Sequence, residues 1–148
     1  MYRTTKALIL RYAPYGDTAR ILTALDEEGE KLTITAHGKF NAVQLYSCSE
    51  LTLRTSKGRL SISEARTIAE FRGLRSSVEA LELAAYTAKA LERIAESDVP
   101  EPALFRLGAR TWNAISEGKL PLKELRKAFE QRAAMLAGFA DFRELEIT

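Results

Sequence analysis

The amino-acid sequence predicts an α+β protein in which a five-stranded antiparallel Greek-key barrel comes first and a small helical bundle follows. Residues 1–70 contain short runs rich in Ile, Leu and Thr, separated by turns that carry Gly, as antiparallel strands do. From Ser76 onward, apolar residues recur at three- and four-residue intervals, which is the period of helices. We expect two domains, 1–70 and 71–148, with a shared core, because about 70 residues alone bury too little surface.

The expected strands alternate between an apolar and a polar face. Leu32, Ile34 and Ala36 alternate with polar residues, so they should point into the barrel. Five short strands at this spacing fit the OB-fold, which binds oligonucleotides on an exposed strand face. An SH3-like barrel would give nearly the same pattern, and spacing alone does not decide between them. The expected strands cover residues 4–12, 18–26, 31–37, 44–55 and 59–65.

Three helices are expected in the second half. Ser76 and Glu79 have the spacing of a capping box, which marks a helix start, and that helix should end before Pro100. A second helix should open at Pro102, because proline is favoured in a first helical turn, and should close near Gly118. A third helix is expected from residue 121 to the C-capping glycine at 138.

Charge and composition limit the classes of partner. The net charge is only +2, but residues 1–75 carry 12 Lys/Arg against 8 Asp/Glu, so a polyanion should meet the first half. The longest aliphatic run, residues 7–10, is far shorter than the ~20 residues of a membrane span. The start of the chain lacks a secretory h-region, and the single cysteine, Cys48, cannot pair within the chain. We expect a cytoplasmic protein in which Cys48 is a small buried hydrophobe.

Catalytic signatures are missing from the sequence. The single histidine, His37, has no GxSxG or HExxH pattern around it, and we interpret it as a loop or strand-end residue. Neither GxxxxGK[ST] nor GxGxxG occurs, so nucleotide use is not expected. The acidic residues at 26–30 surround Gly29 in a hairpin turn, where we expect them to be solvated rather than to hold a metal. The sequence favours a protein that is not an enzyme and needs no cofactor.

Basic and aromatic residues of the first half are candidates for nucleic-acid binding. An OB-type surface holds single strands with cations that neutralise phosphates and with rings that stack on bases. Each of these residues also has an ordinary interpretation, as a solvated cation or as core and turn packing. The candidate rings are Tyr12, Tyr15, Phe40 and Tyr46. The candidate DNA-binding cations are Arg11, Arg20, Lys39, Arg54, Lys57 and Arg59.

Several segments resemble the bacterial RecO family of DNA-repair mediators. In residues 7–25 an apolar strand runs into a turn of Pro, aromatic, polar, acidic and Thr residues, and a second strand follows an Arg, as in the opening of that family. This N-terminal turn is distinctive, whereas the helical part matches mostly in composition. Further similar positions are Gly29 with Lys31 and Leu32, Gly38, Phe71 with Leu74, the helical region 83–91, and segments 126–130 and 136–139.

The resemblance implies a function, a set of partners and a nucleoid-associated location in the cytoplasm. Family members bind single- and double-stranded DNA, anneal complementary strands and help load recombinase, together with other mediators such as RecR, without a nucleotide cofactor. Their helical domain binds the acidic, hydrophobic C-terminal tail of single-strand-binding protein. By position, Arg126 and Lys127 would receive carboxylates of that tail, and Leu125 or Phe129 would border a pocket for its terminal aromatic residue. In the competing interpretation, Arg126 pairs with Glu130 and Phe129 is core.

Two departures from the family pattern bear on function. Many members have a longer basic loop after the third strand, whereas residues 37–43 here contain a single lysine, Lys39, so DNA affinity could be reduced or lost. Many also continue into a Cys-rich zinc module, which this sequence lacks, so it corresponds to a minimal member or a fragment. The leading hypothesis is a DNA-binding recombination mediator. The alternative is a protein-interaction adaptor that kept the scaffold and lost DNA binding.

Overall fold

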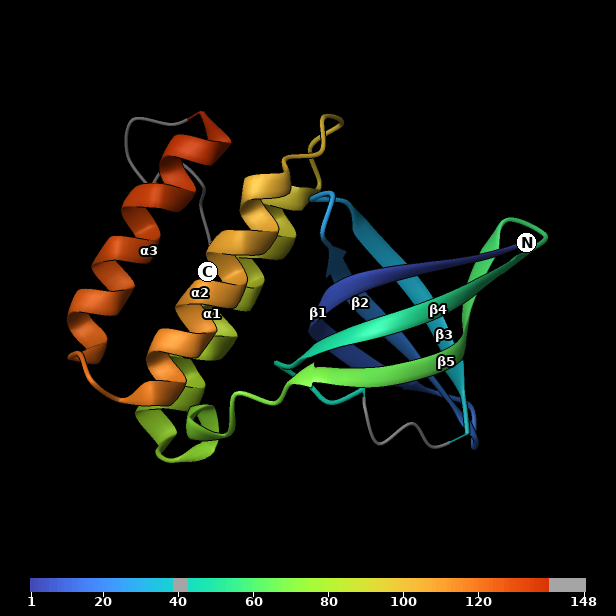
Figure 1. Cartoon of the computed structure of the whole chain (residues 1–148), viewed down its shortest axis with the longest axis horizontal. Coiled ribbons are helices and arrows are strands. Elements are labelled where there is room, and N and C mark those ends of the chain that lie inside the picture. Colours follow the sequence, from blue (N-terminus) through green and yellow to red (C-terminus); the bar gives the residue numbers. More distant parts are fainter. Residues whose placement is uncertain (39–42, 139–148) are drawn as a thin grey trace.

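A computed structural model describes residues 1–38 and 43–138 of the chain. Five strands come first, and a short 3-10 turn leads from them into three helices (Figure 1). The strands are β1 (Tyr2–Tyr15), β2 (Ala19–Asp26), β3 (Lys31–His37), β4 (Cys48–Ser56) and β5 (Arg59–Ala69). The turn is η1 (Arg72–Arg75), and the helices are α1 (Val78–Ala95), α2 (Pro102–Glu117) and α3 (Leu122–Ala137).

The strands close into a barrel in the order β1-β2-β3-β5-β4, which confirms the expected OB-type fold. Four of the five strand pairs are antiparallel. The pair β3–β5 is parallel and short, with Ile34 opposite Leu60 and Thr35 opposite Ser61. The expectation of an entirely antiparallel barrel is therefore wrong at this seam. Two antiparallel pairs, β1–β2 and β2–β3, give β3 the direction of β1, and two others, β1–β4 and β4–β5, give β5 the same direction, so β3 and β5 are parallel where they meet.

Alternation decides which side chains fill the barrel. Leu22 and Ala24 of β2 and Ile34 of β3 are fully buried in one cluster with residues of the other strands. Their neighbours along each strand therefore lie on the outer face. A register shift between Ile9 and Arg11 lets β1 bend around the barrel.

Three strand boundaries differ from the sequence-based ranges by at least three residues. β1 extends to Tyr15 and β5 to Ala69, because long strands are needed to pair with two neighbours each. β4 begins at Cys48 rather than at 44, since the preceding residues form a turn. In that turn Tyr46 has a positive φ of 60°, and the Ser47 hydroxyl donates a hydrogen bond to the Gln44 carbonyl at 2.6 Å.

The first helix begins one residue later than the capping-box pattern predicts. Ser77 has extended backbone angles and its hydroxyl accepts a hydrogen bond from the Ala80 amide. Ser76 has helical angles that close the η1 turn, and its hydroxyl donates to the Gly73 carbonyl, so the Ser76 cap is wrong. The predicted Pro102 start and the two glycine C-caps, Gly118 and Gly138, are confirmed. Within the described ranges, none of the helices has the length and apolarity that a membrane crossing requires.

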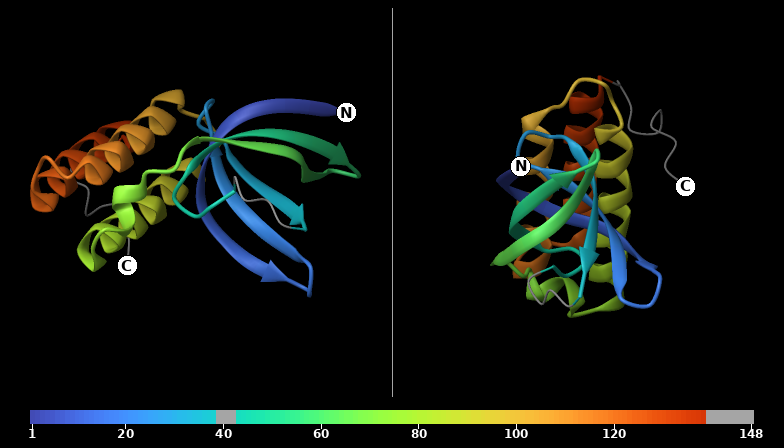
Figure 2. Two further views of the ribbon diagram at one scale, coloured as in Figure 1. Left: turned by 60° about the horizontal axis from the view of Figure 1, so that its bottom comes forward. Right: turned by 90° about the vertical axis from the view of Figure 1, so that its right-hand side faces the viewer.

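The helices and the barrel share one core, as the chain length predicts. Leu8, Leu25 and Cys48 of the barrel belong to the same buried cluster as Leu91 and Trp112 of the helices. α1 and α2 contact the strands, whereas α3 packs on these two helices, so the bundle covers one side of the barrel (Figure 2). The division into domains at residue 70 stays a prediction.

A glycine permits the close approach of α2 to the barrel. A Cβ atom at Gly108 would lie 2.6 Å from Leu8 Cδ1 of β1 and 2.8 Å from Leu91 Cδ1 of α1. Both distances are shorter than carbon atoms tolerate, so any larger residue would force these leucines to shift. Gly108 thus sits where the barrel, α1 and α2 meet.

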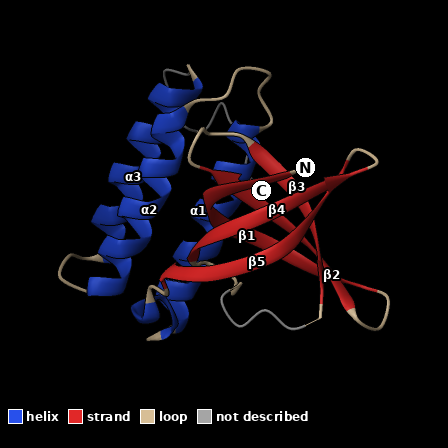
Figure 3. Ribbon diagram, turned by 45° about the vertical axis from the view of Figure 1, so that its right-hand side comes forward, coloured by secondary structure: helices blue, strands red, loops and turns tan. Residues whose placement is uncertain are grey.

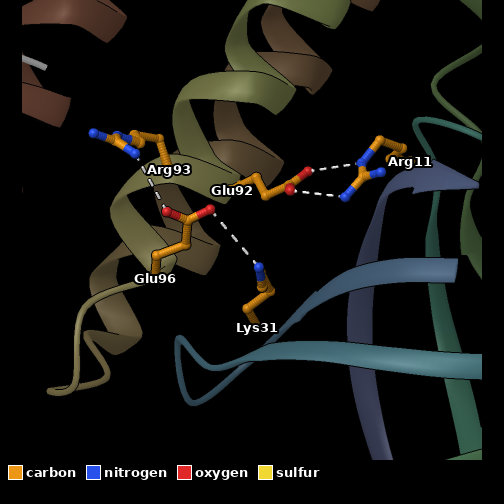
Figure 4. Close-up of polar contacts among 5 residues, drawn as sticks. All are labelled: Arg11, Lys31, Glu92, Arg93 and Glu96. Carbon is orange, nitrogen blue, oxygen red and sulfur yellow. Dashed lines mark hydrogen bonds and ion pairs between the residues drawn. The ribbon is translucent and has the colours of Figure 1, made fainter. Parts of the chain in front are cut away.

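Ion pairs connect the barrel strands to α1 at the edge of this junction (Figure 4). Arg11 of β1 donates two hydrogen bonds to the carboxylate of Glu92 on α1, at 3.1 and 3.0 Å. Lys31 of β3 lies 3.8 Å from Glu96 at the end of α1, and Arg93 lies 3.5 Å from the other oxygen of Glu96. Two basic side chains of the barrel, Arg11 and Lys31, are therefore paired with carboxylates at α1.

Candidate nucleic-acid interface

A groove of about 720 Å³ lies on the barrel between two hairpin turns. Every described residue that lines it belongs to the strands and turns of the barrel. The β1–β2 turn, around Gly16, borders one side, and the β4–β5 turn, around Lys57, borders the other. Both turns lie at the end of the barrel away from the helices, so the bundle does not occlude this region (Figures 1 and 3).

The floor of the groove is the outer face of four strands, β1, β2, β3 and β5. Tyr15 lies opposite Ala19, and Ala19 lies opposite His37, so these residues form one row across β1, β2 and β3. Beside this row, Thr35 of β3 lies opposite Ser61 of β5 across the parallel seam. All five residues line the groove, and the small side chains of Ala19, Thr35 and Ser61 lie among them.

The β4–β5 turn projects a lysine at the border of the groove. Lys57 and Gly58 both have positive φ, 53° and 74°, as a two-residue type I′ hairpin requires. Ser56 and Arg59 form the last pair of the ladder, so the turn places Lys57 and Arg59 near one another. Both cations are exposed and line the groove.

The charge of the groove is mixed but favours anions. Lys57 and Arg59 face one border, and Asp17 of the β1–β2 turn lies at the other. Arg54 lies on the outer face of β4, opposite Ser61, and is exposed beside this border. Three of the predicted DNA-binding cations are thus brought to one end of the barrel.

Two other predicted cations lie elsewhere. Arg11 is held at the helix junction by Glu92, and this hydrogen-bonded ion pair raises the pKa of its guanidinium. Arg20 lies on β2 opposite Pro14, with its guanidinium carbon 5.2 Å from the centre of the Tyr12 ring. Lys39, together with the candidate ring Phe40, falls outside the described residues.

The candidate aromatic residues lie in different surroundings. Tyr15 lines the groove with half of its surface exposed. Tyr12 lies under the Arg20 guanidinium. Tyr46 packs edge-on against Trp112 at 5.7 Å, and burial raises the pKa of its hydroxyl, so it belongs to the core. Burial likewise raises the pKa of the Cys48 thiol to about 11, which confirms its role as a buried hydrophobe.

The predicted partner-binding residues divide between the core and the surface of α3. Leu125 and Phe129 are buried, with 8% and 1% of their surface exposed. Arg126 lies over the Tyr86 ring at 4.3 Å and 3.4 Å from a Glu130 oxygen, which is the pairing of the competing interpretation. Lys127 is exposed on the same helix.

Leu125 and Phe129 nevertheless form part of the floor of a second groove, of about 710 Å³, between α2 and α3. Three arginines border this floor, Arg106 and Arg110 of α2 and Arg132 of α3. The sequence analysis missed them. The spacing of Arg106 and Arg110, four residues apart beside an apolar stripe, was the available signal, but the contact of α2 with α3 could not be read from it.

A hydrogen-bonded cluster connects α1 to α3 next to this second groove. The Tyr86 hydroxyl donates to a Glu130 oxygen at 2.5 Å, and the same oxygen lies near Arg126. Burial and the Glu130 contact raise the pKa of Tyr86 to about 12. The cluster fixes Arg126 to its own bundle.

Comparison with known proteins finds relatives of one kind. The chain is 30% identical over 144 residues to the DNA repair protein RecO of Desulforudis audaxviator, covering 91% of this chain and 56% of that protein. It is 29% identical to RecO of Pelotomaculum thermopropionicum, covering 90% and 54%, and 27% identical to RecO of Bacillus subtilis, covering 82% and 50%.

No protein-family model matches the chain. The chain spans about half the length of the curated relatives it matches. The matched region includes both the barrel and most of the helices, because it covers nine tenths of the chain in the first two comparisons. By this similarity, and with the OB-like barrel and helical bundle described above, the chain is similar to the DNA repair protein RecO over about half of that protein's length.

Proposed function

We propose that this chain is a non-enzymatic DNA-binding recombination mediator that acts in DNA repair in the bacterial cytoplasm. In this role it binds single- and double-stranded DNA, promotes annealing and assists recombinase loading. The curated relatives carry the name DNA repair protein RecO, which supports a role in repair. The position of the barrel groove supports direct contact with DNA.

The single observation that carries the proposal is that the two hairpin turns border one cationic groove from opposite sides. OB-folds bind oligonucleotides on the face between these same turns. Here Lys57 and Arg59 line that face and Arg54 lies beside it, on the part of the barrel that the helices leave open. A phosphate backbone neutralised by these side chains would release counterions, which gives a measurable salt dependence.

The experiment is a titration of a fluorescein-labelled single strand by fluorescence anisotropy across a series of salt concentrations. The affinity should fall as salt rises, and the Lys57→Ala/Arg59→Ala variant should bind more weakly with a shallower slope. Loss of two phosphate contacts to a single strand changes the slope of log K against log salt by about 1.4. A Lys89→Ala/Lys123→Ala variant removes the same charge from exposed helical positions and serves as the control.

Two outcomes would contradict the proposal. Absence of strand binding at low salt would favour the adaptor hypothesis, in which the scaffold binds only proteins. Equal losses in the groove variant and in the helical control would mean that net charge, rather than the groove, attracts the strand. Duplex of the same length, titrated in parallel, tests the double-stranded part of the proposal.

The groove between α2 and α3 supports a second candidate function, the docking of an acidic, hydrophobic peptide such as the tail of single-strand-binding protein. Its floor is apolar, with Leu107, Leu125 and Phe129, and Arg106, Arg110 and Arg132 surround it. Arginine binds carboxylates with two parallel hydrogen bonds, so this combination suits acidic residues that flank an aromatic one.

Peptide titration tests this second candidate. A labelled acidic-hydrophobic tail peptide should bind the wild-type chain and bind more weakly to Arg110→Ala and Arg132→Ala. Arg126→Ala tests the site expected from the resemblance, and we expect a smaller loss there because Arg126 is already engaged by Tyr86 and Glu130. A larger loss of peptide affinity in Arg126→Ala than in Arg132→Ala would mean that the peptide binds the exposed surface of α3 rather than the groove between α2 and α3.

A further inference from the structure

The groove of the barrel contains a row of three residues in which two planar side chains flank a small one. We infer that Tyr15 and His37 hold an unpaired nucleobase above Ala19, so that this groove selects single strands over duplex. The inference rests on the proposed function, because it assigns the ligand class of the same groove. It concerns the bases, whereas the proposed function depends on the phosphates.

The strand register places the two rings on either side of one methyl group. Tyr15 of β1 is the direct partner of Ala19, and Ala19 is the direct partner of His37 of β3. Directly opposite residues point to the same face of a sheet, and neighbouring strands lie about 4.8 Å apart. The backbones of Tyr15 and His37 are therefore about 10 Å apart. Within the described ranges, the residue between them in this row is Ala19, whose methyl group leaves room for a planar ring.

The three residues are accessible from the groove. Tyr15, Ala19 and His37 all line it, and the Tyr15 side chain and His37 are exposed. Tyr12 differs, because the Arg20 guanidinium lies over its ring. Among the barrel tyrosines in the described ranges, Tyr15 is the one that lines this groove.

We call the space between the Tyr15 and His37 side chains the slot. The charges of the groove orient a strand so that its bases face this slot. Lys57 and Arg59 attract phosphates to the β4–β5 border, and the Asp17 carboxylate repels them from the β1–β2 border. A strand with its backbone at the cationic border would direct its bases toward the row of Tyr15, Ala19 and His37. In a duplex the base faces are already stacked and paired, so a base could enter the slot only after unstacking.

The test compares three labelled ligands of equal length on the whole chain at low salt: an oligothymidylate, the same backbone with abasic tetrahydrofuran units, and a duplex. Stacking contributes about fivefold or more in affinity for each base. We expect oligothymidylate to bind at least about fivefold more tightly than the abasic strand. The duplex should resemble the abasic strand, because both offer phosphates without free bases.

Variants locate the effect at the slot. Tyr15→Leu removes a ring and Ala19→Leu fills the space between the rings, so each should lower oligothymidylate affinity toward that of the abasic strand. Tyr15→Phe keeps the ring and should keep the preference. Tyr12→Leu is the control, because Tyr12 is an exposed tyrosine of the same strand that does not line the groove. Circular dichroism and urea unfolding verify that each variant is folded.

The outcomes separate this inference from the proposed function. Equal affinity of the wild-type chain for oligothymidylate and for the abasic strand would overturn the slot and leave the phosphate groove standing. Absence of binding to either strand would overturn both. A loss in Tyr12→Leu as large as that in Tyr15→Leu would also overturn the slot, since the effect would not depend on the groove.

Discussion

The guanidinium of Arg11 on β1 and the carboxylate of Glu92 on α1 form a two-point ion pair across the junction of the barrel and the helices. Arg11 and Arg20 flank the distinctive turn in the sequence, yet the charge of Arg11 is paired within the molecule. This arrangement separates a stabilising arginine from the cations that remain available at the far end of the barrel.

Removal of the ion pair should lower stability while leaving strand binding intact. Glu92→Gln or Arg11→Gln should lower the free energy of unfolding by about 0.5–1 kcal/mol, because the pair is partly exposed and its geometry is good. Urea unfolding at low and high salt measures this, and the loss should shrink with salt. Arg66→Gln, which breaks the Arg66–Glu50 pair within the barrel, is the control and should cost less.

The Arg11→Gln variant also tests the DNA-binding role that the sequence suggests for Arg11. We expect Arg11→Gln to keep the strand affinity of the wild-type chain, whereas Arg59→Gln should lower it. A loss in Arg11→Gln equal to that in Arg59→Gln would show that Arg11 leaves Glu92 to contact phosphate.

Neutralisation of the carboxylate in the groove should strengthen strand binding. Asp17 lies at the β1–β2 border of the groove, so Asp17→Asn should raise the affinity for a single strand. At most about fivefold is expected at low salt, because a charge pair in water at contact distance interacts by about 1 kcal/mol. Anisotropy titration measures the change. Asp98→Asn, an exposed position between α1 and α2, should leave affinity unaltered.

A buried hydrogen bond between α1 and α2 should make a measurable contribution to stability. The Trp112 indole donates to the Thr87 hydroxyl at 3.0 Å, and Trp112 is fully buried. Thr87→Val removes the acceptor and leaves a buried N–H without a partner, which costs about 1–3 kcal/mol. Thr87→Ser should cost less because it keeps the hydroxyl. Urea unfolding followed by circular dichroism gives both values.

The double variant shows whether this cost arises from the hydrogen bond. In a Trp112→Phe background there is no indole donor, so Thr87→Val should cost less than in the wild-type chain. An equal cost in both backgrounds would attribute the loss to packing around Thr87.

The Tyr86–Glu130 contact predicts a loss of stability at high pH. The folded chain raises the pKa of Tyr86 from 10 to about 12, by burial first and by the Glu130 hydrogen bond second. Above pH 10 the unfolded chain releases a proton that the folded chain keeps. The contribution of this proton is therefore complete below pH 10 and is lost as the pH rises through 12.

Tyr86→Phe isolates this contribution. The stability difference between the wild-type chain and the variant should be largest near neutral pH and should narrow above pH 10, in urea unfolding at a series of pH values. A difference that stays constant with pH would mean that Tyr86 keeps an ordinary pKa in the folded chain.

The order and type of the elements could be predicted from the sequence, because each depends on local patterns. Alternation marked the β3 segment at the bounds that the structure shows, and proline and glycine marked the ends of α2. The cap at Ser77 was missed, because only Ser76 has a glutamate three residues later, Glu79, whereas in the structure Ser76 closes the η1 turn and Ser77 caps the helix.

The candidate site could be predicted only as a set of residue types. The sequence indicated that Lys57 and Arg59 follow a turn, but their meeting with Tyr15 and Asp17 depends on how the strands curve. The sequence also could not show that Arg59 is available for binding whereas Arg11 is paired, because this depends on the docking of α1, which brings Glu92 to Arg11. The arginines of the α2–α3 groove were missed for the same reason, since they converge from two helices.

The sequence by itself determined that a strand-rich half precedes a helical half, since hydrophobic period and turn residues act within a few positions of the chain. The tertiary structure alone decided the parallel β3–β5 seam, the neutralisation of Arg11 by Glu92, and the groove where two distant turns border one row of side chains. These features depend on barrel closure and helix docking. They join residues that are far apart in the chain, and their contacts are set by how the whole core packs.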